Sequence, residues 1–210
     1  MNVARVRLRH VDRAGCVSPA DFEHGGVKGR SALDAAWNAS LEGEIGGNSS
    51  GKGSGTILLD LSKCYERVPL EALGKAAVAE GWPGRVVAMA LGQYSSVRFV
   101  SVAGATVPAG NATCGMIPGC ALAVRFLGSY LKAPIKRAIR RAARGRARIR
   151  TYVDDLRISV EGTPEEVAEI LTAFLLALKE ELEQLGIRLE LPKCCALGAT
   201  HNTEKPLRQP

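Results

Sequence analysis

Apolar residues along the chain follow two different periods, which predict strands in some segments and helices in others. Residues 56–61 form a short apolar run, typical of a buried strand, that contains one acid near its end. Residues 97–107 alternate and turn at Gly104, which predicts a β-hairpin. A second hairpin is predicted from the apolar runs 149–153 and 156–160, with the two acidic residues between them as its turn.

Helices are predicted where apolar residues recur every three or four positions next to start and stop signals. Ser31 is a suitable N-cap for the first helix, in which Leu33, Trp37 and Leu41 share one side. Thr163 begins the last helix with an N-cap, a first-turn proline and a capping-box glutamate. The predicted helices are 31–42, 69–81, 83–94, one from about Cys120 to a break at Pro134, and 163–185.

Helices interleave with hairpins instead of alternating with single strands. This order predicts an α+β fold in which helices pack on one face of an antiparallel sheet. A short strand is expected at 187–191, while the Gly/Ser run 46–55 is predicted to be a flexible loop. The polar tail 200–210 is predicted to be disordered.

Positive charge is concentrated in one segment. The chain carries a formal charge of +7, and residues 136–150 contain eight Lys and Arg but no acid. Four of these arginines recur at helical intervals, which would align them on one face as a nucleic-acid contact: Arg137, Arg140, Arg141 and Arg144. A solvated helix face or a flexible basic loop would show the same composition.

The remaining composition indicates an intracellular protein, nuclear or cytoplasmic and not secreted. Six cysteines show no spaced framework, and the N-terminus lacks the apolar run of a signal peptide. No apolar stretch reaches transmembrane length without interruption, so no membrane contact is expected.

Asp60, Asp154 and Asp155 are the candidate catalytic residues. Adjacent carboxylates on a hairpin turn repel each other unless a cation neutralises them, although an ordinary solvated turn would also accept them. Asp60 ends an apolar strand, where its carboxylate needs a partner or a metal. Acids at the ends of two apolar strands would suit a pair of hard divalent cations, about 3.5–4 Å apart in phosphoryl-transfer sites.

Four segments, in order, resemble motifs of reverse transcriptases of the non-LTR retroelement type. They are 60–69 (DLSKCYERVP), 115–120 (GMIPGC), 151–156 (TYVDDL) and 186–193 (GIRLELPK), with a weaker similarity at 25–31 (GGVKGRS). The resemblance implies a polymerase palm at 56–199, partial fingers at 1–55 and no thumb. The basic fingers hairpin would precede residue 1, and a larger polyprotein would supply the missing regions.

The resemblance also implies the metal ligands. Asp60 and Asp154 would hold two Mg²⁺ ions, with Mn²⁺ as an alternative and Asp155 adjacent. Leu61 would offer its backbone carbonyl to the site. The primer 3′-hydroxyl would then attack the α-phosphorus of the incoming nucleotide.

Further residues would contact substrate if the resemblance holds. The ring of Tyr65 would screen the sugar 2′ position, and Lys193 would stabilise the leaving pyrophosphate or act as general acid. Gly115 and Gly119 would let the backbone approach the template or the incoming base. Each has a simpler interpretation: core packing for Tyr65, a surface lysine for Lys193, and a plain turn for Gly115.

The chain departs from the family pattern at Pro118, where the family usually carries glutamine, so the hydrogen bonds of that side chain are lost. Lys28 and Arg30 are the only candidate fingers contacts for the nucleotide triphosphate. Without the rest of the fingers and thumb, weak activity is expected from these residues alone.

Three functions remain open from the sequence. The leading hypothesis is an RNA-directed DNA polymerase palm that transfers nucleotides from dNTPs to a DNA primer on an RNA template, as a fragment of a retroelement polymerase. The alternative is a catalytically inactive nucleic-acid-binding remnant that uses residues 136–150. An RNA-templated RNA polymerase would share the acids, but Tyr65 argues against room for a 2′-hydroxyl.

Overall fold

The computed structural model describes residues 8–9, 11–12, 15–47, 53–117, 119–143 and 146–199. The chain divides into two compact units. One combines Met1–Pro19 with Lys63–Tyr130, and the other combines Ala20–Ser62 with Leu131–Pro210. Each unit is therefore assembled from segments far apart in the sequence, and the two are described separately.

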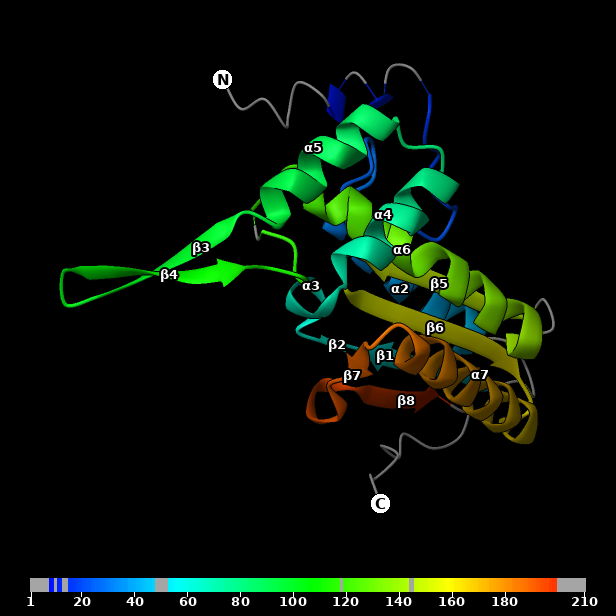
Figure 1. Ribbon diagram of the computed structural model, residues 1–210. Helices are drawn as coiled ribbons and strands as arrows, with labels where there is room; N and C mark the ends of the chain where they lie inside the picture. The colour runs from blue at the N-terminus through cyan, green and yellow to red at the C-terminus, as the bar shows by residue number, and fades with distance from the viewer. Residues whose placement is uncertain are drawn as a thin grey trace. The chain divides into compact units, whose positions relative to one another are not determined.

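A four-stranded antiparallel sheet forms the second unit (Figure 1). Its strand order is β5-β6-β1-β8. The strands are β5 (Ala147–Tyr152), β6 (Asp155–Gly162), β1 (Gly53–Leu59) and β8 (Cys195–Ala199). Two shorter strands, β2 (Leu61–Ser62) and β7 (Arg188–Leu189), pair beside it. The predicted α+β fold with an antiparallel sheet is confirmed.

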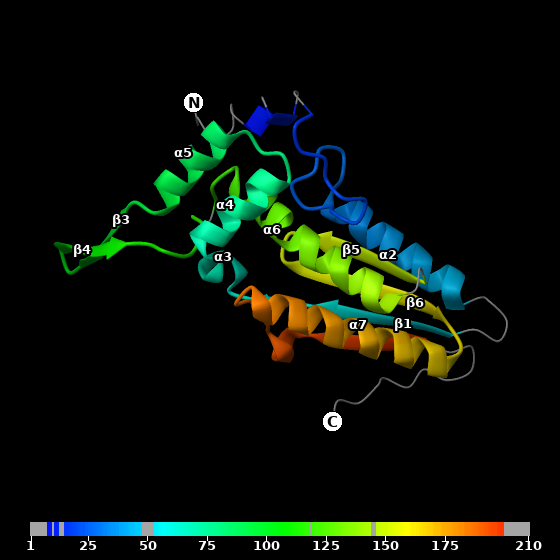
Figure 2. The same cartoon turned by 45° about the vertical axis from the view of Figure 1, so that its right-hand side comes forward.

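Alternation along β6 separates an apolar face of the sheet from a polar one. Leu156, Ile158 and Val160 are buried, whereas Arg157 and Ser159 between them project to the other side. The apolar face packs against α7 (Pro164–Gln184), whose length follows the sheet in Figure 2. The polar face meets α2 (Ala32–Gly47), because Arg157 donates a hydrogen bond to the Ala39 carbonyl at 3.0 Å. Helices therefore contact both faces, where the sequence predicted one.

Local signals begin the helices of this unit where the sequence predicted. The capping box of α7 is complete, with Thr163 Oγ accepting from the Glu166 amide and Glu166 accepting from the Thr163 amide. Ser31 Oγ likewise accepts from the Asp34 amide at the start of α2. The apolar residues predicted to share one side of α2 include Leu33 and Trp37, and both are exposed.

The first unit is mainly helical. It contains α3 (Cys64–Arg67), α4 (Leu70–Ala79), α5 (Gly84–Tyr94) and the hairpin of β3 (Val97–Val102) and β4 (Ala105–Asn111). The hairpin turns at Gly104, as predicted. The core of the first unit includes Trp82, whose ring centroid lies 4.5 Å from that of Phe126. The Trp82 Nε1 donates a hydrogen bond to Ser129 Oγ at 2.8 Å.

The predicted helix break at Pro134 is wrong. The helix α6 (Ala123–Ala138) runs through this residue and continues as the π-helical turn η1 (Ile139–Ala143). Its apolar side, including Leu131 and Ile135, is almost completely buried. Burial of that side offsets the roughly 3 kcal/mol that an internal proline costs a helix.

Two boundaries near the glycine-rich run differ from the prediction. The helix α2 extends to Gly47 and β1 already begins at Gly53, while residues 48–52 lie outside the described part. Gly55 lies within β1, and a Cβ there would overlap the Val167 and Leu171 side chains of α7. The missing side chain therefore allows close helix packing.

The C-terminal part of the sheet was only partly predicted. The expected strand at 187–191 is the two-residue β7, followed by the 3₁₀ turn η2 (Leu191–Lys193). The next strand, β8, was not predicted, and the tail 200–210 lies outside the described residues. All six cysteines are free, and no helix in the described ranges is long and apolar enough to span a bilayer.

Candidate active site

Asp60 lies between two strands, where the chain leaves β1 and enters β2. Its neighbours Leu59 and Leu61 are both buried, and they anchor the backbone on either side. The Asp60 carbonyl accepts a hydrogen bond from the Glu190 amide at 2.9 Å. The carboxylate, 24% exposed, therefore stands at a fixed position at the edge of the main sheet.

Asp154 and Asp155 lie at the tip of the β5–β6 hairpin. Tyr152 pairs with Asp155, so the central turn residues are Val153 and Asp154, one position earlier than predicted. Val153 has a φ of +63°, which a β-branched residue rarely adopts and which tightens the turn. Asp155 thus becomes the first residue of β6 instead of part of the turn.

Strand register brings Asp60 and Asp155 together. Leu59 of β1 pairs with Leu156 of β6, the last pair of that ladder. The next residue outward on each strand is Asp60 on one side and Asp155 on the other. Positions opposite each other in antiparallel strands lie about 4.5–5.5 Å apart, so the two acids emerge from the same end of the sheet.

The charges at this end interact. The pKa of Asp155 is raised, first by partial desolvation and then by the negative charges of Asp154 and Asp60. Lys193 opposes this effect, and its Nζ lies 3.2 Å from Asp60 Oδ2. Hydrogen bonding to Asp60 raises the pKa of Lys193 in return. One ammonium therefore faces three carboxylates, which leaves the cluster net negative.

A cleft of about 370 Å³ opens beside these acids on the polar face of the sheet. Asp60, Asp155 and Lys193 line it, together with Arg150 and Arg157 from the same two hairpin strands. Ala35 of α2 also lines it. The candidate catalytic groups therefore border a space with both anionic and cationic walls.

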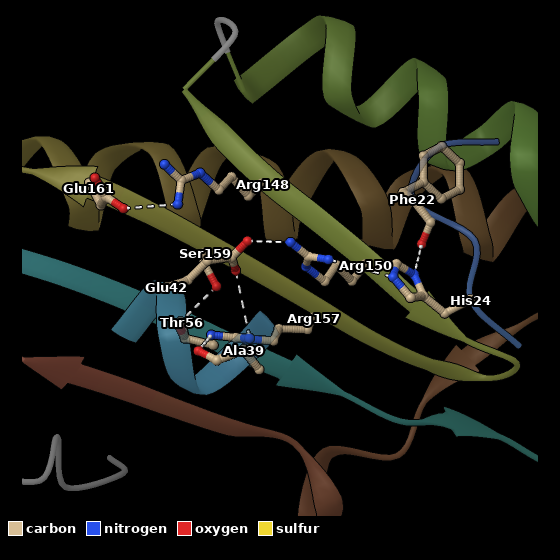
Figure 3. A network of polar contacts seen from close by, with 10 residues as sticks. All are labelled: Phe22, His24, Ala39, Glu42, Thr56, Arg148, Arg150, Arg157, Ser159 and Glu161. Carbon is tan, nitrogen blue, oxygen red and sulfur yellow. Dashed lines mark hydrogen bonds and ion pairs between the residues drawn. The ribbon is translucent and has the colours of Figure 1, made fainter. Parts of the chain in front are cut away.

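Arginines on the polar face form a network that the sequence analysis missed (Figure 3). Glu42 of α2 forms a hydrogen-bonded ion pair with Arg150, and its second oxygen lies 3.7 Å from Arg157. The Nε of Arg150 is buried and makes no hydrogen bond. Arg150 of β5 and Arg157 of β6 each stand between apolar or buried neighbours, so the alternation of polar and apolar residues in the sequence could have indicated a shared polar face. Their acidic partner lies 108 residues before Arg150 in the chain.

Leu61, Tyr65, Gly115 and Gly119 do not all belong to the unit that holds the acids. Leu61 is buried in β2 of the second unit, while the other three lie in the first. The Tyr65 carbonyl accepts from the Met116 amide at 2.8 Å, which joins the two motif segments. Gly115 has a φ of +90°, and a Cβ there would lie 3.0 Å from the Glu66 carbonyl.

Of the two candidate fingers residues, Lys28 is exposed and Arg30 has a structural role. The Arg30 guanidinium donates to the backbone carbonyls of Ala20, Asp21 and Glu23. These bonds close the loop between residues 20 and 30. Arg30 is therefore committed to the protein itself in this structure.

The predicted nucleic-acid face is partly neutralised. Arg137 Nε donates to Glu181 at 2.7 Å, and Arg141 NH2 donates to Glu180 at 2.6 Å. Arg140 is exposed, and Arg144 lies outside the described residues. At least two of the four predicted arginines therefore form ion pairs with α7.

The donor set at the acids suits a hard divalent cation. Carboxylate oxygens are the ligands that Mg²⁺ prefers, and it is commonly held by one or two carboxylates plus water and substrate phosphates. Within the described residues, no three His, Cys, Asp or Glu side chains are grouped to hold an ion by themselves. The ammonium of Lys193 beside Asp60 offsets only one of the three negative charges at this edge.

The sequence matches a known family over most of its length. Residues 20–204 match the family described as reverse transcriptase (RNA-dependent DNA polymerase). No curated protein sequence matches the chain.

Solved structures share the fold. An apo telomerase of Candida tropicalis truncated from its C-terminal domain has a TM-score of 0.62 at 12% identity, over 98% of this chain and 40% of that one. The Candida tropicalis telomerase in complex with a TWJ fragment of telomeric RNA has a TM-score of 0.64 at 12% identity, over 93% and 32%. The corresponding Candida albicans complex has 0.62 at 14% identity, over 93% and 34%. The chain thus spans two fifths or less of these structures.

Proposed function

Because this chain belongs to the reverse transcriptase family, we propose that Asp60, Asp154 and Asp155 form the catalytic centre of an RNA-directed DNA polymerase. The reaction would join the primer 3′-hydroxyl to the α-phosphorus of a dNTP and release pyrophosphate. The observation that carries the proposal is that strand register places Asp60 and Asp155, from two distant segments, at one end of the sheet, where the charge of Asp154 also acts on Asp155. The RNA template, the DNA primer and the retroelement origin are part of the proposal.

Asp60 and Asp154 would hold two Mg²⁺ ions, with Asp155 beside them. Bound there, the ions would acidify the primer hydroxyl and stabilise charge on the phosphate oxygens. The raised pKa of Asp155 supports this assignment, because its partial burial and then the negative charges of Asp154 and Asp60 favour uptake of a proton or a cation there. The Leu61 carbonyl would complete the ligand set.

Lys193 would serve in two successive contacts. Its ammonium lies 3.2 Å from Asp60 Oδ2. In the reaction Lys193 would contact the pyrophosphate oxygens, where a positive charge stabilises the leaving group. Its high exposure, 66% of the side chain, supports such mobility.

Other roles rest on the motifs. Tyr65 would screen the sugar 2′ position and so favour deoxynucleotides, and Gly115 and Gly119 would let the backbone approach the base pair. The positive φ angles of both glycines support a need for glycine there.

We assign the palm to residues 56–199 and part of the fingers to 1–55. The neighbouring structures are two to three times longer, so these residues alone should extend primers poorly.

The test compares Asp154→Asn with Asp21→Asn, an exposed acid in the same unit. Mn²⁺ binding to the 210-residue chain is measured by electron paramagnetic resonance, and primer extension is measured in a polymerase that contains this palm. We expect Asp154→Asn to lose extension and at least tenfold in Mn²⁺ affinity, while Asp21→Asn keeps both. Equal behaviour of the two variants would disprove the catalytic assignment.

The same variants test the nucleic-acid-binding alternative. A non-catalytic remnant would not extend a primer, and the Asp154→Asn substitution would leave its affinity for RNA or DNA unchanged. The ion pairs of Arg137 and Arg141 reduce the free positive charge on which that alternative depends. Arg140 and Lys136 remain exposed for such contacts.

A further inference from the structure

The loop at residues 20–30 adds a short parallel segment to the edge of β5, beside the catalytic hairpin. The His24 amide donates to the Thr151 carbonyl, and the Thr151 amide donates to the Phe22 carbonyl, both at 2.8 Å. Glu23 and Thr151 form the corresponding parallel bridge. This pairing ends one residue before Tyr152, so it reaches the base of the turn that carries the acids.

Gly25 continues from this pairing onto the turn itself. A Cβ built on Gly25 would lie 2.5 Å from the Val153 amide nitrogen and 2.6 Å from its Cγ2. Its φ lies outside the left-handed region, so glycine is needed for space and not for backbone conformation. Val153, by contrast, holds a φ of +63° that its branched side chain disfavours. Such a conformation persists only where surrounding contacts impose it.

His24 connects the same loop to the arginine network in Figure 3. The residue is 6% exposed, and its Nδ1 lies 3.2 Å from the Phe22 carbonyl. A carbonyl only accepts, so Nδ1 carries the proton and Nε2 is the acceptor. Arg150 NH1 points at that Nε2 from 3.5 Å, and Arg150 is in turn paired with Glu42 of α2.

We propose that Gly25 and His24 are positioning residues that hold the Val153 turn, and with it Asp154 and Asp155, in register with Asp60. Gly25 blocks outward relaxation of the turn, and His24 fixes Arg150 three residues before Val153 of the turn. This inference rests on the proposed catalytic role of the three acids. It assigns a function to a loop whose charged residues, Lys28 and Arg30, were expected to contact the nucleotide.

The first experiment substitutes Gly25→Ala, with Gly92→Ala as its control. Gly92 is exposed in α5, and a Cβ there meets no atom within 4 Å. Mn²⁺ alone is titrated into the 210-residue chain, and hydrogen exchange is followed at the Thr151 and His24 amides. We expect Gly25→Ala to weaken Mn²⁺ binding at least tenfold and to increase the rate of hydrogen exchange at both amides at least tenfold. Exchange at Ile57 and Ile158, in the middle of the sheet, should not change.

The second experiment compares His24→Leu with His24→Gln. Glutamine keeps an acceptor near the position of Nε2, whereas leucine fills the space without one. We expect His24→Leu to lose most of the Mn²⁺ affinity and His24→Gln to retain it within about threefold. A role limited to core packing would give the reverse order, because leucine is the better core residue.

The outcomes separate this inference from the proposed function. If Asp154→Asn abolishes Mn²⁺ binding but Gly25→Ala and His24→Leu do not weaken it, the positioning role is overturned and the catalytic assignment stands. If the unaltered chain binds no Mn²⁺, the catalytic assignment fails. The loop contact is then judged by exchange: faster Thr151 exchange in Gly25→Ala supports it, and unchanged exchange overturns it.

Discussion

Replacing Arg137 with Ala tests whether the basic stretch is a structural element as well as a charged surface. Arg137 Nε donates to Glu181 at 2.7 Å, and the Glu181 side chain is only 7% exposed on the inner side of α7. The substitution leaves this buried carboxylate without its main partner. We expect the second unit to lose stability.

The magnitude follows from the burial of the two groups. Breaking a fully buried ion pair by removing one partner costs about 3–5 kcal/mol. The cost is lower here because Arg137 is 42% exposed and because Arg141 remains 3.6 Å from Glu181. We therefore expect a loss of about 2 kcal/mol, which lowers the melting temperature of a domain this size by about 4–8 °C.

Urea unfolding of the 210-residue chain, followed by far-ultraviolet circular dichroism, measures this loss. Arg140→Ala is the matched control, because Arg140 is an exposed arginine three residues away. Its free energy of unfolding should change by no more than about 0.5 kcal/mol. The double variant Arg137→Met with Glu181→Leu should recover to within about 1 kcal/mol of the unaltered chain, because it removes both charges.

Equal stability of Arg137→Ala and Arg140→Ala would refute the reasoning. Binding of single-stranded RNA, measured in the same variants at two salt concentrations, should show the opposite order. Arg140→Ala should weaken binding and reduce its salt dependence, because an exposed arginine contributes to counterion release. Arg137 is already neutralised, so its loss should weaken RNA binding less.

Three further predictions concern single contacts. Arg146 lowers the pKa of Glu166 to about 2. The ion pair therefore stabilises the start of α7 fully above about pH 4.5, and this stabilisation is lost as the pH falls toward 2. Glu166→Gln should remove this part of the pH dependence of amide hydrogen exchange at the start of α7. Ser129→Ala leaves the buried Trp82 indole N–H without its acceptor and should cost about 1–3 kcal/mol in urea unfolding. Gly55→Val should cost about 1–3 kcal/mol because it overlaps α7, and an unchanged unfolding midpoint would contradict that packing.

Local sequence signals were sufficient to predict element ends where residues close in sequence make the hydrogen bonds or adopt the backbone conformation that the end requires. The capping box at Thr163 and Glu166 places the start of α7, and Gly104 with its left-handed φ places the β3–β4 turn. Both need only residues within three positions, so they could be predicted directly. Pro134 failed as a signal for the opposite reason, since burial of α6 outweighs a local preference.

The acids show the same division within the site. Ordered motifs around Asp60, Asp154 and Lys193 predicted which residues to examine, because each motif is contiguous. The register of the strands that carry these residues could not be predicted from the motifs. The hairpin turn lies at Val153 and Asp154 because β6 pairs with β5 from Asp155 onward. Only the ladders between β1, β5 and β6 decide which carboxylates face each other.

The α+β class, the family and the acids at the ends of two apolar strands could all be predicted from the residues in order. The pairing of Arg137 with Glu181, the place of Glu42 beside two arginines and the close approach of Gly25 to Val153 came only from the folded chain. These contacts differ from the predicted features in their distance along the chain. Periodicity and capping act within one or two turns of a helix or a few residues of a strand. A buried charge or a close backbone contact depends on which distant segment packs against it.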